Sequence, residues 1–246
     1  MGKALSPARE GSARRDADRV RDIDAALKEC YGDRPWSPRF DDLLDGLVHT
    51  ILSQNTNDEN SRRAFRRLKE RFPTWEAAAS APMEEVEEAI RPGGISRVKA
   101  GRIKELLRKV KEDHGGYSLA PLEDMEPDRA MAYLLDIPGV GRKTASVLLL
   151  FQLGHPYFPV DTHVLRVGRR LGLIPRRAGA VRAHLIMDEL VPDDIKYRLH
   201  LNLVEHGRRV CRARNPLCGE CRLRGSCPRI GLEEEEKAGR GGRPGG

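Results

Sequence analysis

The stretch LLDIPGVGRKTASVLLL, residues 134–150, places an apolar segment on each side of a Pro-Gly-Val-Gly turn. Its two glycines, Gly139 and Gly141, allow the backbone to turn tightly and to approach another molecule closely. A helix that begins directly behind them presents unpaired N–H groups and a partial positive charge, which together attract anions. The stretch therefore predicts a hairpin between two apolar helices.

This hairpin has two interpretations. A Gly-x-Gly turn alone most often does no more than connect two helices. Here Arg142 and Lys143 follow the turn, and the chain carries 44 Lys and Arg against 37 Asp and Glu, with a pI of about 9.3. We therefore favour a nucleic-acid phosphate bound through Gly139, Val140, Gly141 and Arg142, a contact that positions a nucleic acid without reading its sequence.

Lys143 is open to three roles: a surface charge, a phosphate contact or a nucleophile. A free lysine with a pKa near 10.4 is deprotonated in about one part in 2,500 at pH 7, which corresponds to about 4.6 kcal/mol. A helix N-terminus disfavours the cation by only about 0.3–1 kcal/mol. Nucleophilic chemistry therefore requires a substrate that seals the site and desolvates the amine. On this physical argument alone, a surface or phosphate-binding lysine is favoured.

The segment FPVDTHVLRVGRRLG, residues 158–172, places Asp161 directly before a helix with apolar periodicity. The favoured interpretation is a helix N-cap whose carboxylate accepts the N–H of His163 or Val164. A capping carboxylate can also act in chemistry, by stabilising a developing positive charge on a sugar and by handling protons. His163 either lines a pocket or bonds to the backbone, and the sequence does not distinguish the two.

Four of the five cysteines form a C-x6-C-x2-C-x5-C pattern: Cys211, Cys218, Cys221 and Cys227. In an intracellular, reducing compartment this pattern indicates metal ligation rather than disulfides. Structural zinc sites more often show two close Cys pairs, whereas an iron–sulfur cube also needs four thiolates, so the spacing leaves both open. Cys30 lies on the apolar face of a predicted helix, where we expect a buried structural thiol.

Helical periodicity covers most of the chain and alternating strand patterns are nearly absent, which predicts an all-α protein. The strongest apolar stripe consists of Phe40, Leu43, Leu44, Leu47, Val48, Ile51 and Leu52. No apolar run approaches the roughly 20 residues that span a bilayer. We expect residues 1–15 to form a disordered basic arm, and the Glu- and Gly-rich residues 231–246 a disordered tail.

Taken together, these motifs resemble those of the endonuclease III family of helix-hairpin-helix DNA glycosylases. The resemblance runs from about residue 37 to residue 229 and rests on IPGVGRKTA, on VDTH and on HGRRVC with the cysteines that follow. It implies a six-helix barrel domain over residues 37–155, with the hairpin at 134–150. It also implies a second helical domain, built from residues 16–36 and 156–230, in which Cys211, Cys218, Cys221 and Cys227 hold a [4Fe-4S] cluster.

The resemblance further implies that Lys143 is the catalytic lysine and Asp161 the catalytic aspartate. In the implied mechanism a damaged nucleotide is extruded from double-stranded DNA, Lys143 attacks its C1′, the base leaves, and β-elimination from the Schiff base cuts the strand. Gln54 and Asn55, in SQNTND, would fill the gap left in the duplex. Ile95 would be an apolar wedge between bases, with a packed helix-staple residue as the alternative.

The resemblance implies removal of oxidised pyrimidines, by a monomer that acts inside the cell at the nucleoid and has no membrane partner. SQNTND departs from the more usual SAQATD, so a glycosylase for alkylated or mismatched bases is an alternative. Thr50 stands where adenine-glycosylase relatives carry glutamate, which argues against adenine removal. A catalytically silent DNA-structure binder, which would use only the hairpin and the basic loops, is the third hypothesis.

Overall fold

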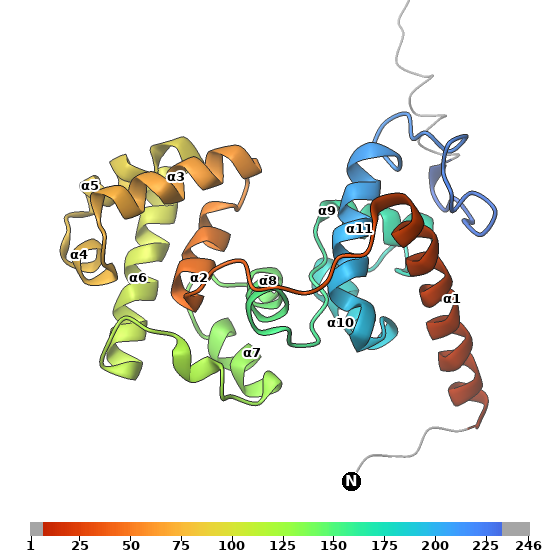
Figure 1. The fold of residues 1–246 in the computed structure, drawn as a ribbon, viewed down its shortest axis with the longest axis horizontal. Coiled ribbons are helices and arrows are strands. Elements are labelled where there is room, and N and C mark those ends of the chain that lie inside the picture. Colours follow the sequence, from red (N-terminus) through yellow and green to blue (C-terminus); the bar gives the residue numbers. More distant parts are fainter. Residues whose placement is uncertain (1–6, 233–246) are drawn as a thin grey trace, which may run out of the picture. The chain divides into compact units, whose positions relative to one another are not determined.

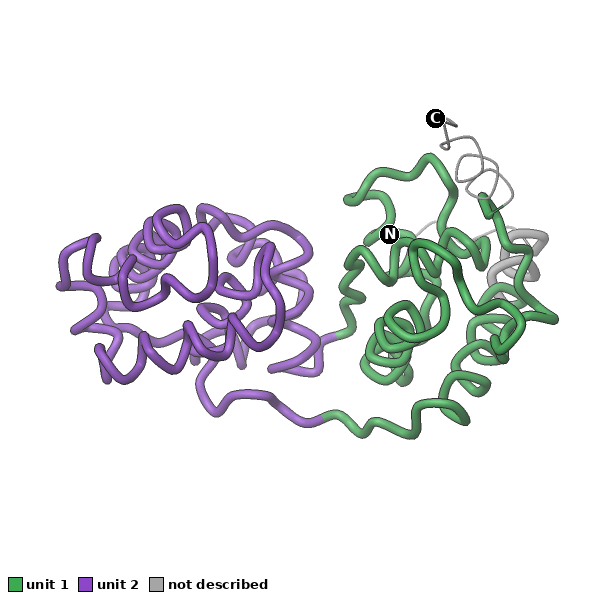
Figure 2. The backbone as a smooth tube through the Cα atoms, turned by 90° about the horizontal axis from the view of Figure 1, so that it is seen from above, with its two compact units in different colours: residues 1–36, 156–246 green, residues 37–155 purple. Residues whose placement is uncertain are grey.

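The computed structural model describes residues 7–232, with side chains from residue 15 onward. These residues form helices, turns and loops and no strand, so the prediction of an all-α fold is confirmed. The chain divides into two compact units (Figure 2): unit 1 comprises residues 1–36 and 156–246, and unit 2 comprises residues 37–155. None of the described helices combines the length and the apolar character that a membrane span requires.

Unit 2 is built from consecutive helices (Figure 1): α2 (Leu43–Leu52), α3 (Asp58–Arg71), α4 (Trp75–Ser80), α5 (Met83–Ile90), α6 (Ser96–His114), α7 (Pro127–Leu135) and α8 (Arg142–Leu153). Two 3-10 turns, η1 (Arg91–Gly93) and η2 (Ala120–Leu122), precede α6 and α7. The apolar stripe predicted around residues 43–52 is buried along α2, which packs against α3, α6 and α8. The core of unit 2 therefore lies directly beneath the loop that follows α2 and beneath the start of α8.

The helix boundaries of unit 2 follow local sequence signals. The Asn57 side chain caps α3 by accepting the N–H of Asn60 at 2.8 Å, and α7 begins with Pro127 at its first position. Gly115, in the left-handed conformation, ends α6. Each of these signals acts on its own helix end, so the boundaries of α3 and α7 at their starts and of α6 at its end follow from local sequence.

Unit 1 contains α1 (Pro7–Tyr31), α9 (Thr162–Arg170), α10 (Ala180–Leu190), a 3-10 turn η3 (Asp193–Ile195) and α11 (Lys196–Arg209). Helix α11 packs against α1 and α9, and α10 packs against α1. The buried apolar residues that join these helices include Val20, Ile23, Leu27, Val164, Val167, Met187, Leu199 and Leu203. This core fixes the start of α9 and the end of α11, where Asp161 and Cys211 lie.

Two predictions about α1 are wrong. The helix begins at Pro7, so residues 7–15 belong to a helix and not to a disordered arm; proline at the first position and the Ala, Arg and Glu that follow favour a helical start. Cys30 is exposed rather than buried. The buried face of α1 passes through Leu27, and the next helical position on that face is taken by Tyr31, which leaves Cys30 on its flank.

At the other end of the chain, the predicted disordered tail starts too early. Leu232 is buried against the C-terminal loops of unit 1, because its apolar side chain lines the same cavity as the four cysteines. Residues 1–6 and 233–246, which make up the rest of the predicted arm and tail, lie outside the described residues.

Candidate functional site

The hairpin of unit 2 joins α7 to α8, as the sequence predicts. Gly139 has φ +82°, a left-handed conformation that glycine adopts without strain. The N–H of Val140 donates to Ile137 O at 3.0 Å, and the Val140 side chain is only 5% exposed. Gly141 then caps α8 in an extended conformation. Val140 therefore anchors the turn in the core, while Gly139 and Gly141 lie at the surface.

The start of α8 leaves backbone donors without acceptors inside the helix. The first backbone bond of the helix runs from the N–H of Ala145 to Gly141 O at 3.0 Å, so the N–H groups of Arg142, Lys143 and Thr144 precede the helical ladder. Gly141 has no side chain with which to cap them. These donors and the helix dipole make the hairpin a fitting site for a phosphate.

Lys143 stands on the exposed side of this first turn. The three residues behind it, Thr144, Ala145 and Ser146, are buried, so the lysine projects from a packed helix rather than from a mobile loop. The amine is thus held at the hairpin by a rigid backbone and is open to an incoming molecule. Preorganised placement of this kind is what a nucleophile requires.

Gln54 is brought to the start of α8 by contacts that sequence reasoning missed. Its Nε2 donates to Thr144 Oγ1 at 3.2 Å, and its Oε1 accepts from Arg102 Nη1 at 2.5 Å. Neighbouring Asn55 is exposed and has φ +53°, a left-handed conformation that asparagine tolerates. Arg102 lies on α6, 48 residues from Gln54, and only its position three residues after an apolar-face lysine, Lys99, marks it in the sequence.

Ile95 combines exposure with backbone strain. Its side chain is 54% exposed, and φ +49° with ψ 41° places a β-branched residue in the left-handed region, where it is rare. Such a conformation costs about 1–3 kcal/mol and persists where the surrounding structure enforces it. An exposed apolar side chain on a strained backbone does not fit a packed helix staple, and it fits a residue that contacts a partner.

In unit 1, Asp161 is the N-cap of α9, as the sequence predicts. Its Oδ1 accepts the N–H of Val164 at 2.7 Å, and the residue is half-buried. The segment before it is tied to α10: the N–H of Val160 donates to His184 Nε2 at 3.0 Å, and the N–H of Phe158 donates to Asp188 Oδ1 at 2.6 Å. The carboxylate is therefore held by its own helix, and the backbone before it is held by α10.

His163 follows Asp161 on α9 and is also half-buried. Its Nδ1 lies 3.1 Å from Arg166 Nη2, and Arg166 Nη2 donates to Gly207 O at 2.7 Å. A side chain at position 207 would bring a Cβ to 2.9 Å from His163 Cβ, so glycine allows α11 to approach α9 here. His163 thus packs at the junction of these two helices.

The four clustered cysteines converge on one place in the structure. Cys211, Cys218, Cys221 and Cys227 line a single cavity together with Val167 of α9, Leu171 just after it and His206 of α11. Among the described residues, no three His, Cys, Asp or Glu side chains are arranged to hold a single metal ion. A cavity lined by four thiols offers the four thiolates that an iron–sulfur cube needs, one at each iron.

The surroundings of two of these thiols disfavour the thiolate unless a cation lies nearby. Burial, and secondarily the neighbouring cysteines, raise the pKa of the Cys221 and Cys227 thiols, so four thiolates need a cationic partner to coexist there. Buried Arg170 contributes one positive charge: its Nη1 lies 3.4 Å from Cys211 Sγ and donates to Arg212 O at 2.7 Å. A cationic metal group would supply the rest.

Comparison with known proteins places these features in one family. The model of the HhH-GPD superfamily of base excision DNA repair proteins matches residues 48–192, and the iron–sulfur binding domain of endonuclease III matches residues 211–227. The chain is 38% identical to endonuclease III of Thermotoga maritima over 205 residues, which cover 83% of this chain and 92% of that protein. It is 37% identical over 180 residues, 73% of its length, to an Arabidopsis thaliana relative named as a candidate DNA glycosylase, and spans 59% of that protein.

A solved structure agrees with these matches. A trapped covalent intermediate of endonuclease III with DNA has a TM-score of 0.75 to this chain at 27% identity, covering 89% of this chain and 98% of that one. The matched C-terminal domain is one that binds an iron–sulfur cluster, and the matched solved structure contains DNA. Because the fold, the hairpin and the cysteine domain all coincide, the chain belongs to the endonuclease III branch of the HhH-GPD superfamily of base excision DNA repair proteins.

Proposed function

We propose that the protein is a bifunctional DNA glycosylase and abasic-site lyase that removes oxidised pyrimidines, with Lys143 as the nucleophile. The observation that carries the proposal is the placement of Lys143: an exposed amine on the rigid first turn of α8, beside the uncapped donors of the hairpin. A phosphate bound at those donors would hold the DNA strand next to the amine. Endonuclease III itself forms a covalent intermediate with DNA, which supports this chemistry.

The reaction balances with the groups at hand. The deprotonated Lys143 amine attacks C1′ of an extruded nucleotide, the glycosidic bond breaks, and the base leaves with the electron pair and takes up a proton. Opening of the sugar gives a protonated Schiff base between C1′ and Lys143. Loss of a proton from C2′ then drives cleavage of the C3′–O bond, and the 3′ phosphate departs with the electron pair.

We assign Asp161 to the stabilisation of the positive charge that develops on the sugar as the base leaves. Its Oδ1 is engaged by the N–H of Val164, so the carboxylate keeps a fixed direction and its Oδ2 remains for the reaction. A carboxylate held by its own helix costs little reorganisation at the moment of charge development.

Four residues that contact DNA in this proposal differ in how the structure presents them. Gln54 and Asn55 follow α2 and would occupy the gap left by the extruded nucleotide, while exposed Ile95 would act as the wedge. Half-buried His163 would border the sugar or a nearby phosphate. We also propose that the protein works as a monomer inside the cell, at the nucleoid.

We propose that Cys211, Cys218, Cys221 and Cys227 are the ligands of the [4Fe-4S] cluster. The support is their shared cavity and the iron–sulfur binding domain model that matches residues 211–227. A cluster held by these four thiolates would cross-link the loops after α11 and so supply folding energy to unit 1. Substitution of Cys221 by Ser should remove the broad visible absorbance of a bound cluster from the purified protein.

Borohydride trapping tests the proposed chemistry. Wild type, Lys143→Ala and Lys111→Ala, a control that removes an exposed lysine from the far end of α6, are each incubated with a thymine-glycol duplex and an abasic duplex. We expect a covalent adduct on both duplexes that is lost only in Lys143→Ala. No adduct from folded, DNA-binding wild type would leave Lys143 as a phosphate contact and favour a silent DNA binder.

The same experiment addresses the substrate. SQNTND departs from the more usual sequence of the family, so a glycosylase for alkylated or mismatched bases is the second candidate function. An adduct on the abasic duplex alone would keep the lyase and exclude thymine glycol as the substrate. Release of 3-methyladenine would then support the second candidate.

A further inference from the structure

One buried histidine of unit 1 lies against the cysteine cavity and has no part in the proposed reaction. His206 is 3% exposed and lines the cavity together with the four clustered cysteines. Its Nε2 lies 3.6 Å from Cys221 Sγ, a distance at which sulfur takes part in a hydrogen bond. The backbone O of His206 also accepts the N–H of Cys211 at 2.8 Å. The imidazole is therefore held against one of the proposed cluster ligands.

The other nitrogen of the same ring binds a residue 175 positions earlier in the chain. Tyr31, the last residue of α1, places its hydroxyl oxygen 2.9 Å from His206 Nδ1. The two rings also meet edge to face, with their centroids 6.0 Å apart, and the guanidinium of Arg209 lies 5.7 Å from the centre of the Tyr31 ring. One row of contacts thus runs from α1 through His206 to Cys221.

The chemistry of these three groups sets the direction of both hydrogen bonds once Cys221 is a metal ligand. A ligating Sγ is a thiolate, which has no hydrogen and only accepts. Burial favours the neutral imidazole, so its proton must lie on Nε2, and Nδ1 is then an acceptor. The Tyr31 hydroxyl keeps its proton at neutral pH and donates to Nδ1. Both bonds therefore point towards the sulfur, and each polarises the other.

We propose that His206 is a positioning residue for the iron–sulfur cluster: it donates Nε2–H to the Cys221 thiolate, and Tyr31 fixes its ring. The proposal rests on the proposed ligand set, in which Cys221 binds the cluster. A hydrogen bond to a ligand sulfur draws electron density away from the cluster and so favours its reduced form. The row of residues therefore raises the reduction potential of the cluster and slows its loss from the protein.

Removal of the donor should lower the reduction potential. If the bond favours the reduced over the oxidised cluster about three- to tenfold, its loss lowers the potential by about 28–59 mV, because a tenfold change corresponds to about 59 mV for one electron. We expect this shift in His206→Leu. His206→Gln can place an amide N–H near the position of Nε2 and should keep a potential close to that of wild type. Tyr31→Phe keeps the ring contacts and should give a smaller shift in the same direction.

Two measurements on the full-length holoprotein check these expectations. Protein-film voltammetry gives the reduction potential, and the decay of the visible absorbance in the presence of an iron chelator gives the rate of cluster loss. We expect this decay to be about 10- to 100-fold faster in His206→Leu than in wild type. Tyr31→Phe combined with His206→Leu should match His206→Leu alone, because the hydroxyl acts only through the imidazole.

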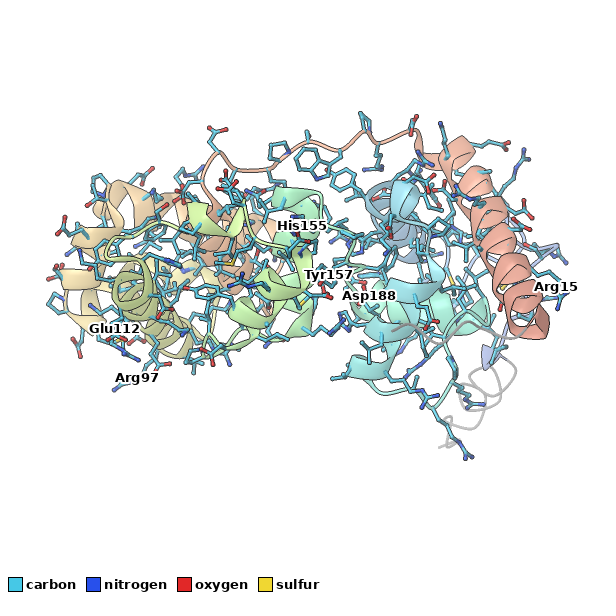
Figure 3. The ribbon with its side chains drawn as sticks, turned by 90° about the horizontal axis from the view of Figure 1, so that it is seen from below. Arg15, Arg97, Glu112, His155, Tyr157 and Asp188 are labelled. Carbon is cyan, nitrogen blue, oxygen red and sulfur yellow. The ribbon has the colours of Figure 1, made fainter. Side chains whose placement is uncertain are left out.

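A second buried histidine of α11 provides the matched control. His200 is 7% exposed, but of these two described histidines only His206 lines the cysteine cavity. His200 Nδ1 donates to Pro159 O at 2.9 Å, in the segment that carries Tyr157 and is bound by Asp188 (Figure 3). His200→Leu therefore also removes a buried hydrogen bond from unit 1. It should lower the stability of the fold and leave the reduction potential unchanged.

The outcomes distinguish this inference from the ligand set on which it rests. Wild type that holds no iron and has no visible absorbance overturns the ligand set and this inference with it. A cluster whose potential is the same in wild type and His206→Leu overturns the role of His206 alone. So does an equal shift in His200→Leu, or a shift that His206→Gln does not reverse. A shift in His206→Leu that is absent from His206→Gln and His200→Leu supports the proposal.

Tyr31→Phe keeps the proposal testable if His206→Leu retains no cluster. The hydroxyl lies on α1, outside the cysteine loops, and its removal leaves the imidazole in place. A lowered potential in Tyr31→Phe then supports the row of hydrogen bonds, and an unchanged potential overturns it.

Discussion

Substitution of Gly139 by Ala should destabilise unit 2 for two separable reasons. At φ +82° an alanine incurs the left-handed penalty of about 1–2 kcal/mol. Its Cβ would also lie 2.8 Å from the stem of Arg102, and relief of such a contact in a packed site costs about 1–3 kcal/mol. We therefore expect a loss of about 2–5 kcal/mol in the free energy of unfolding, together with displacement of Arg102 from Gln54.

Two other glycines, at the C-terminal end of α6, isolate the two contributions. Gly115 has φ +72°, but a Cβ added there would meet no atom within 4 Å, so Gly115→Ala should show the conformational cost alone, about 1–2 kcal/mol. Gly116 has neither feature, and Gly116→Ala should lie within about 0.5 kcal/mol of wild type. The difference between Gly139→Ala and Gly115→Ala measures the contact with Arg102.

Urea unfolding followed by tryptophan fluorescence measures these differences in unit 2. Trp75 is buried there and donates to Asp45 Oδ1 at 2.8 Å, whereas the other tryptophan, Trp36, is exposed and belongs to unit 1. A Trp36→Phe background therefore gives a single reporter. If Gly139→Ala proves no less stable than Gly115→Ala, the arginine does not occupy the space beside the hairpin, and the reasoning about Arg102 fails.

Three further predictions follow from the same structure. Lys99→Met removes two hydrogen bonds from a charged donor, one to Leu52 O and one to Gly93 O. At about 1.5–3 kcal/mol for each bond, the free energy of unfolding of unit 2 in urea should fall by about 3 kcal/mol or more. An unchanged free energy of unfolding in this variant would show that the two bonds make no net contribution. Burial lowers the pKa of His49 below its usual 6.5, so the unfolded chain binds the proton more tightly than the folded chain. The contribution of neutral His49 to stability is therefore fully present above about pH 6.5 and is lost as the pH falls through the lowered pKa. Unfolding curves at several pH values should show this loss reduced in His49→Gln, and an equal loss in the variant would assign it to other groups. Binding to an abasic duplex should weaken roughly 500-fold for a fourfold rise in salt if about five phosphates are neutralised, measured by fluorescence anisotropy, and a flat dependence would contradict a phosphate-binding surface.

Features that depend on near neighbours in the chain are predictable from the sequence. The turn at Gly139 and Gly141, the Asp161 cap and the apolar face of α2 all arise within a few residues, because conformational preference, capping and periodicity act at that range. The error at residues 7–15 is of the same local kind, since a prediction from charge gives too little weight to helix propensity.

Features that depend on packing are not predictable in this way. The prediction of a buried Cys30 is wrong because a helical face is buried only where another element covers it, and Tyr31 takes that place at the end of α1. The role of Lys143 cannot be decided from its pKa for a similar reason. Its amine loses its proton and becomes a nucleophile only where a bound substrate removes it from water. The resemblance to a family, and not the composition around the lysine, leads to the proposed chemistry.

The sequence by itself determined an all-α chain, a hairpin with the donors for a phosphate, and four cysteines that suit one metal group. Only the tertiary structure decided that these cysteines share a cavity and that Arg102, from a helix 48 residues further on, meets Gln54 beside the hairpin. The physical reason is the separation along the chain over which each interaction acts. Local signals choose the conformation of each segment, whereas the direction in which Gln54 points depends on a guanidinium that only the packing of α6 against the hairpin brings within 2.5 Å.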